Sequence, residues 1–334
     1  MQGALWRDER AVHLLTRGNV DGLVSSAFLF SAHPEARVTY VPSAANAIDN
    51  LRKDLSSRRF YLIDIGLTPK LIKTINLKAK TGQEVVFIDH HQQSQLYCHE
   101  LGPHVLPVVT QGPSAATVAL DHLALETPAL AGREGLARLA AVADVVEYCD
   151  SPYLDSAIER YGMPRLLDEA EHLDFSWRLQ IDDDRFRASA ARKLARGLWP
   201  SEVPEVKARY LQMVNENRWL RAQERVRSRM VVHGNVAILN FGKEKTSLLG
   251  FGSRALHAVA REAGCSVAVL VNRRKHLTSL ALRAVGETSL NLGQFVEDFT
   301  RIHGVSGGGH PTSAGAKIPS RSLPAFLNEV VACG

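Results

Sequence analysis

The chain has 334 residues, of which 45% are hydrophobic and 22% charged, and a formal net charge of +5. It is longer than one hydrophobic core usually serves, so we expect two domains in an ordinary globular protein. No apolar run approaches the roughly 20 residues of a membrane span, the N-terminus is too charged for a signal peptide, and four scattered cysteines disfavour a disulfide framework or a cysteine zinc site. We therefore expect a cytoplasmic protein with no membrane partner.

Short apolar runs alternate with amphipathic segments over the first 150 residues. The pattern predicts strands over 11–16, 37–41, 59–65 and 84–88, and helices over 23–30, 70–80, 113–123 and 133–148. Strands that alternate with helices are typical of a parallel sheet built from crossover units.

The remainder of the chain changes character twice. Residues 151–230 read as helical and charged, ending in a long helix over about 208–229. The apolar segment over 231–241 begins a second α/β pattern, with strands over 266–271 and 278–283 and helices over 254–263 and 292–302. We predict an α/β protein with a parallel-sheet domain (1–150), a helical linker (151–230) and a smaller C-terminal α/β domain (231–334).

Basic residues accumulate between Arg185 and Arg229. They are Arg185, Arg187, Arg192, Lys193, Arg196, Lys207, Arg209, Arg218, Arg221, Arg225, Arg227 and Arg229. Two interpretations stay open: a solvated helix face, or a basic wall beside a phosphate-binding cleft.

Acidic and histidine residues follow the predicted strands of the first domain. Asn19 and Asp21 come after the first strand, Asp64 closes the third, and Asp89-His90-His91 close the fourth. Open parallel sheets bind ligands just beyond the carboxyl ends of their strands, so we expect these side chains to converge. Singly, Asp21 or Asp64 has the alternative role of a helix N-cap.

Asp144 lies within an otherwise apolar helix. A lone carboxylate is costly to bury there unless it is paired or binds a metal, so a metal ligand and a salt-bridged core acid are the alternatives. Aspartate and imidazole together suit a divalent ion such as Mn²⁺, or Mg²⁺, which can polarise a phosphoryl oxygen and generate hydroxide at neutral pH.

A glycine run near the C-terminus ends in a histidine. Gly307, Gly308 and Gly309 would let backbone N–H groups approach an anion, and His310 could donate to phosphate or stack on a base. Arg283, at the end of a predicted strand, could form a bidentate phosphate contact. The alternatives are a flexible turn and a solvated surface arginine.

These motifs together resemble the DHH phosphoesterase superfamily with a C-terminal DHHA1 domain, which includes RecJ-type exonucleases and nanoRNases. The resemblance covers residues 11–150 and 231–320. It implies that Asp64 bridges two metal ions, and that Asp21, His90 and Asp144 complete one of the two sites. It also implies that Asp89 orients its neighbours and that His91 contacts the scissile phosphate.

In the second domain the resemblance assigns substrate binding to Arg283 and to the glycine motif from Gly307 to His310. The first motif departs from the family pattern His-x-Asp-x-Asp-Gly, because the chain has Arg17 and Asn19 at the two ligand positions. An arginine cannot bind a cation, and a neutral amide is a poorer ligand than a carboxylate. One metal site therefore looks intact and its partner broken.

Two functional hypotheses follow. The first is a metal-dependent phosphoesterase that hydrolyses short oligonucleotides, nucleotide derivatives or single-stranded nucleic acid, in which Arg17 supplies fixed positive charge to the transition state. The second is a catalytically impaired protein of the same fold that binds nucleotides or nucleic acid. A homodimer is the assembly that we keep open.

Overall fold

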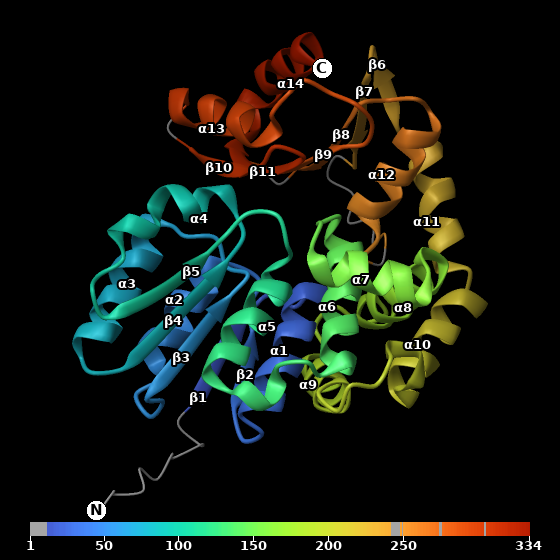
Figure 1. Cartoon of the computed structure of the whole chain (residues 1–334). Coiled ribbons are helices and arrows are strands. Elements are labelled where there is room, and N and C mark those ends of the chain that lie inside the picture. Colours follow the sequence, from blue (N-terminus) through green and yellow to red (C-terminus); the bar gives the residue numbers. More distant parts are fainter. Residues whose placement is uncertain (1–11, 242–247, 249, 274–275, 304) are drawn as a thin grey trace, which may run out of the picture. The chain divides into compact units, whose positions relative to one another are not determined.

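The computed structural model describes residues 12–241, 248, 250–273, 276–303 and 305–334, except the side chains of Ser306 and His310 (Figure 1). The chain forms two compact units, Met1–Leu211 and Gln212–Gly334. The predicted boundaries near residues 150 and 230 stay predictions. None of the helices in the described ranges has both the length and the apolar character that a membrane crossing requires.

The first unit contains a five-stranded sheet in which every neighbouring pair is parallel, as predicted. Its strand order is β2-β1-β3-β4-β5, and the strands are β1 (Val12–Thr16), β2 (Arg37–Tyr40), β3 (Arg59–Ile63), β4 (Glu84–Asp89) and β5 (Val105–Val109). Strand β5 was not predicted, because Pro107 interrupts its apolar pattern; as an edge strand, β5 tolerates a proline.

Helices follow the strands of this unit. They are α1 (Val20–Ala32), α2 (Ala44–Lys53), α3 (Pro69–Lys80), α4 (Gln92–Tyr97), α5 (Ala115–Glu126), α6 (Glu134–Glu147), α7 (Pro152–Tyr161), α8 (Met163–Arg178) and α9 (Asp184–Leu194). Several begin where a hydroxyl accepts a backbone N–H three residues on, as Thr68 does for α3 and Ser114 for α5. Short α4 and amphipathic α2 were not predicted.

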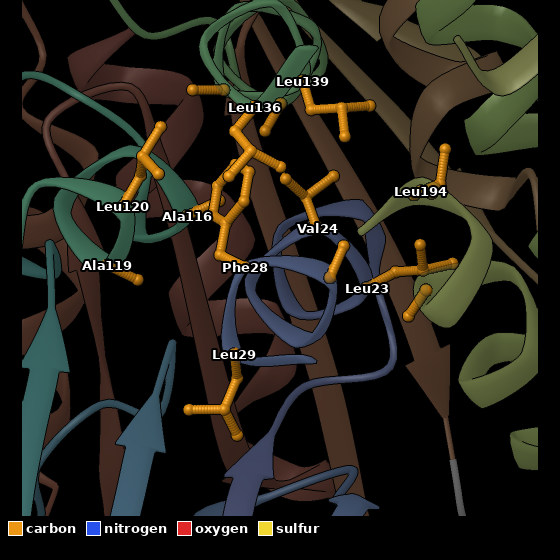
Figure 2. Close-up of a cluster of buried hydrophobic side chains, with 14 of the residues drawn as sticks. Leu23, Val24, Phe28, Leu29, Ala116, Ala119, Leu120, Leu136, Leu139 and Leu194 are labelled. Carbon is orange, nitrogen blue, oxygen red and sulfur yellow. The ribbon is translucent and has the colours of Figure 1, made fainter. Parts of the chain in front are cut away.

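Both faces of the sheet are buried, which explains the nearly continuous apolar runs of its strands. Along β1, Leu14 joins one hydrophobic cluster, with α1, α5 and α6, while Leu15 joins another, with α2 and α3. Figure 2 shows Phe28 of α1 beside Ala116 of α5 and Leu136 of α6. The helices thus fix the sheet from two sides and leave its ends for the site.

The long helix predicted over 208–229 is wrong. The segment forms α10 (Pro204–Asn215) and α11 (Arg218–Arg227), separated at Asn217. Asn217 has a left-handed backbone with φ 49°, which asparagine adopts more readily than most residues and which ends an α-helix.

Part of the basic run between 185 and 229 is neutralised locally. Carboxylate partners lie beside several of its cations, in the pairs Arg187–Asp184, Lys193–Glu205, Arg209–Asp183, Arg218–Glu216 and Arg227–Glu262. These pairs weaken the interpretation of the run as a basic wall.

The second unit contains a six-stranded sheet of order β10-β11-β9-β8-β7-β6. Only β7 and β8 pair in parallel among its described strands. The strands are β6 (Val231–His233), β7 (Val236–Asn240), β8 (Val267–Arg273), β9 (Leu277–Ala284), β10 (Ser306–His310) and β11 (Ser313–Pro319), and the further helices are α12 (Gly252–Glu262), α13 (Leu292–Ile302) and α14 (Leu323–Cys333).

Two segments of this unit take a form that the sequence pattern left open. The apolar segment over 231–241 is a hairpin, because Gly234 turns the chain with φ 57° between β6 and β7. The glycine run, for which a flexible turn was one alternative, is the strand β10 paired with β11.

Candidate metal centre

The loops after β3 and β4 bring three predicted residues together. Asp64, His90 and His91 each offer a ligand atom, and these atoms lie within 4.8 Å of one another. Asp64 directly follows β3 with a left-handed φ of 59°, and its N–H bonds to the carbonyl of Ile88 at 3.2 Å. That backbone conformation is rare outside glycine, asparagine and aspartate, so the turn is a local strain at the edge of the sheet.

Asp21 approaches the same cluster from α1. The Nε2 atom of His90 lies 3.8 Å from Oδ2 of Asp21 and 3.9 Å from Oδ1 of Asp64. Because the carbonyl of Pro113, 3.2 Å away, can only accept a hydrogen bond, Nδ1 of His90 donates to it, and Nε2 faces the two carboxylates. Ligands that share an ion at about 2.1 Å lie about 3–4 Å apart, so each of these two carboxylates lies at a distance from His90 that suits a shared divalent ion.

His91 has a different environment. Its Nδ1 lies 2.7 Å from Oδ1 of Asp89, which is fully buried and also accepts from the hydroxyl of Ser94. Burial alone would lower the pKa of His91, but the charge and hydrogen bond of Asp89 outweigh it and raise that pKa to about 9. Burial would raise the pKa of Asp89, but the His91 charge outweighs it and lowers the pKa to about 2. The pair is therefore an imidazolium held by a carboxylate at neutral pH.

The N-terminus of α5 binds two of the predicted ligands. Asp21 accepts from the N–H groups of Ala115 at 3.1 Å and Ala116 at 2.5 Å. Asp144 accepts from the N–H of Ser114 at 2.8 Å and from the hydroxyl of Ser151 at 2.6 Å. Burial and the charge of Asp64 hold the pKa of Asp21 well above its usual range, which favours a bound cation as a partner for its ionised form. Asp144 is hydrogen-bonded rather than salt-bridged within the described structure, and its role as a ligand stays a prediction.

The altered first motif is tied to Asp64 by an amide. Asn19 caps α1, accepting from the N–H of Gly22 at 3.0 Å, and its Nδ2 donates to Oδ2 of Asp64 at 3.0 Å. This donor satisfies the carboxylate oxygen without any cation. The side chain of Arg17 is exposed, and its charge has a minor lowering influence on the pKa of His91. The residues present thus fit one ion, with an amide donor on the other oxygen of Asp64.

In the second unit, strand register aligns the two predicted substrate-binding positions. His310 in β10 pairs with Ser313 in β11, and Ser313 pairs with Arg283 in β9. The three residues form one row across adjacent strands, and Arg283 is exposed. The side chain of His310 lies outside the described part of the structure.

The glycines of β10 have packing roles that the sequence analysis did not foresee. A Cβ atom at Gly309 would lie 2.2 Å from the carbonyl oxygen of Ser313, and one at Gly307 would lie 2.7 Å from Val296 of α13. Gly308 has φ +155°, a region that glycine favours. Close approach of neighbouring elements therefore explains Gly307 and Gly309 without any ligand.

Two contributors escaped the sequence analysis. Ser94 was not singled out, and its donation to Asp89 has no signal beyond its position at the start of a helix. Arg187 was counted only within the basic run, yet it is buried and its Nε donates to the carbonyl of Gly18 at 2.9 Å. A contact across that sequence distance leaves no local pattern.

Comparison with known proteins agrees with this architecture. The family model described as the DHHA1 domain matches residues 253–333. No curated protein sequence matches the chain.

Three solved structures share the fold over nearly the whole chain. The DHH domain of a member of a family of ribosomal proteins aligns with TM-score 0.66 and 17% identity, covering 97% of this chain and 87% of its own. The pGpG-specific phosphodiesterase PggH of Vibrio cholerae aligns with TM-score 0.53 and 16% identity, covering 97% and 100%. An exopolyphosphatase-related protein of Bacteroides fragilis gives 0.53 and 12%, covering 97% and 92%.

The Asp-His-His motif begins at the last residue of β4 in the parallel sheet, and the DHHA1 family model matches residues 253–333. The chain therefore contains a segment similar to the DHHA1 domain and shares its fold with these three solved structures.

Proposed function

We propose that this protein is a metal-dependent phosphodiesterase acting on short oligonucleotides or nucleotide derivatives. The observation that carries the proposal is the cluster of Asp64, His90 and His91, whose ligand atoms lie within 4.8 Å of one another, with Asp21 3.8 Å from His90. A Mn²⁺ or Mg²⁺ ion bound there would polarise the phosphoryl group and acidify a water molecule. The imidazole ligand favours Mn²⁺, since Mg²⁺ prefers oxygen ligands.

His91 would bind the scissile phosphate. With a pKa of about 9 it is protonated at neutral pH and can donate to a phosphoryl oxygen. Asp89 fixes the orientation of the ring through Nδ1 and stabilises its charge. The guanidinium of Arg17 would add a second positive charge near the same oxygen atoms.

The second unit supports a nucleotide as substrate. Arg283 offers a bidentate donor to a phosphate, and its row leads through Ser313 to His310. One structural relative is a pGpG-specific phosphodiesterase and another is exopolyphosphatase-related, so both ligands belong in the test. Single-stranded nucleic acid, a homodimer and a cytoplasmic location remain parts of the proposal.

The direct test uses the purified full chain with Mn²⁺ or Mg²⁺ and labelled dinucleotides, short RNA and DNA strands, nucleotide bisphosphates and inorganic polyphosphate. We expect mononucleotide release, and a loss of more than about 100-fold in Asp64→Asn. Asp298→Asn, at an exposed carboxylate of α13 that bonds Arg301, is the matched control and should keep wild-type rates. No turnover of any substrate would refute the proposal.

The amide donor on Asp64 favours one alternative, a protein that binds nucleotides without cleaving them. Calorimetry that shows tight nucleotide binding with no cleavage would support it. The double variant Arg17→His with Asn19→Asp should then gain hydrolysis, because it restores the family's ligand types at both positions.

A further inference from the structure

Helix α9 buries an arginine against the first loop. Arg187 is only 3% exposed. Its Nε donates to the carbonyl of Gly18 at 2.9 Å, its Nη1 donates to Asp184 at 2.6 Å, and its Nη2 donates to the carbonyl of Ile181. The guanidinium also lies 5.4 Å from the ring centre of Tyr40 and 5.7 Å from that of Trp177. The contacts leave the side chain little freedom.

Stability alone does not account for this burial. The one carboxylate bonded to Arg187 in the described structure, Asp184, has a side chain 57% exposed, so solvent weakens the pairing. Apolar residues of similar volume often stabilise a protein as well as a buried ion pair does. Among its hydrogen bonds, the one to the carbonyl of Gly18 links α9 to the loop that follows β1, across 169 positions of the sequence.

Gly18 has no side chain to obstruct this contact. A Cβ atom at position 18 would lie 3.0 Å from Cζ of Arg187, so the guanidinium rests directly against the glycine backbone. The next residue, Asn19, caps α1 and donates to Asp64 at 3.0 Å. Arg187 therefore holds Gly18, and Asp64 holds Asn19, the next residue of the same loop.

We propose that Arg187 is a positioning residue that holds the first loop in its ligand-binding shape. Positions 17 and 19 offer no strong cation ligand, so protein contacts rather than a second ion fix this loop beside Asp64 and Asp21. The inference rests on the proposed function, because the loop matters only if the centre binds an ion. Arg187 itself touches neither the ion nor the substrate.

The test compares Arg187→Ala and Arg187→Lys with Arg192→Ala in the full chain. Arg192 is a matched control: it lies on the same helix, donates to the carbonyl of Pro34 at 2.7 Å and covers the ring of Phe30 at 3.9 Å. Mn²⁺ affinity is measured by calorimetry, and hydrogen exchange of the peptide over residues 16–23 is measured without metal. Removing groups that orient metal ligands typically weakens affinity about 10–100-fold.

We expect Arg187→Ala to weaken Mn²⁺ binding about tenfold and to speed exchange of that peptide, while Arg192→Ala changes neither by more than about twofold. Arg187→Lys should fall between them, since lysine keeps the charge and loses the planar fork. If Arg187→Ala does not fold, Gly18→Ala perturbs the same contact from the other side and should have the same effects. A folded variant with wild-type affinity and exchange would overturn the inference. If the wild type binds no Mn²⁺, the proposed function fails, and unchanged exchange in the variants would overturn the positioning role separately.

Discussion

The Nδ2 atom of Asn19 donates a 3.0 Å hydrogen bond to Oδ2 of Asp64. The other oxygen of the same carboxylate, Oδ1, lies 3.9 Å from both His90 and His91. One oxygen of Asp64 thus accepts from a neutral amide, while the other faces two imidazole rings. A change in charge at position 19 should therefore alter how strongly the Asp64 carboxylate depends on a bound cation.

Asn19→Asp should make the centre more dependent on metal. Aspartate can keep the cap on α1, but it replaces a donor to Asp64 with a second negative charge. We expect the metal-free variant to lose about 1–3 kcal/mol of stability and to show a larger rise in Tm with Mn²⁺ than the wild type. Thermal denaturation with and without Mn²⁺ measures both, and Asn46→Asp, at an exposed position of α2, is the control. Equal metal responses in the two variants would contradict the prediction.

The charge of His91 should depend on Asp89. Burial opposes protonation of His91, so without the carboxylate its pKa should fall from about 9 to below its ordinary value of 6.5. Titration of the ring by NMR in Asp89→Asn tests this, with Ser94→Ala as a control that keeps the Asp89 charge. The stability that protonated His91 contributes is complete below pH 6.5 and is lost as pH rises through about 9. An unchanged titration in Asp89→Asn would show that other groups hold the proton.

Mild acid should destabilise the first unit through His13. This residue is 1% exposed and lies 2.7 Å from Asp54 and 2.8 Å from Thr39. Burial and the charge of Arg37 lower its pKa to about 4, so the fold favours the neutral ring. Stability present above the ordinary pKa of 6.5 is lost as pH falls toward 4, by on the order of 3 kcal/mol.

Urea denaturation at pH 7.5 and pH 4.5 measures this loss. His13→Asn, which cannot be protonated in this range, should show a smaller difference between the two pH values. His104→Asn, at an exposed histidine, should leave the difference as in the wild type. If His13→Asn keeps the full pH dependence, another group is responsible.

Gly309 should tolerate no side chain, whether or not a substrate is present. Its Cβ would lie 2.2 Å from the carbonyl of Ser313, whereas a Cβ at Gly315 in the next strand first meets an atom at 3.4 Å. We expect Gly309→Ala to lower stability by about 1–3 kcal/mol and Gly315→Ala to change it by less. Chemical denaturation measures both variants. A stable Gly309→Ala protein that binds nucleotide poorly would assign this glycine to the ligand instead.

The sequence was informative where a rule of topology or burial operated. Apolar strands buried on both faces gave the parallel sheet, and the ends of parallel strands meet at one edge, which brought Asp64 to His90 and His91. These inferences need only local patterns. The predicted role of His91 at a phosphate is not tested by its proximity to the cluster.

What the sequence did not reveal depends on contacts between distant residues or on backbone geometry. The sequence around Gly18 does not predict its contact with Arg187, and the sequence around Asp144 does not predict its hydrogen bond with Ser114. The break between α10 and α11 arises from one left-handed residue, Asn217, and an amphipathic pattern does not reveal such a backbone conformation. The glycine run did not predict a strand, because glycine usually disfavours strands unless neighbours approach too closely for a side chain.

The left-handed backbone at Asp64 also constrains how this protein can diverge. With φ 59°, the position accommodates glycine, asparagine and aspartate far better than glutamate or histidine. Of those three only aspartate carries charge, so no other acid or imidazole can replace it in the turn at comparable cost. A descendant that keeps this turn and loses the aspartate would lack the carboxylate that we propose as the central metal ligand. If that proposal holds, the identity of this one residue would sort metal-binding from metal-free relatives by sequence.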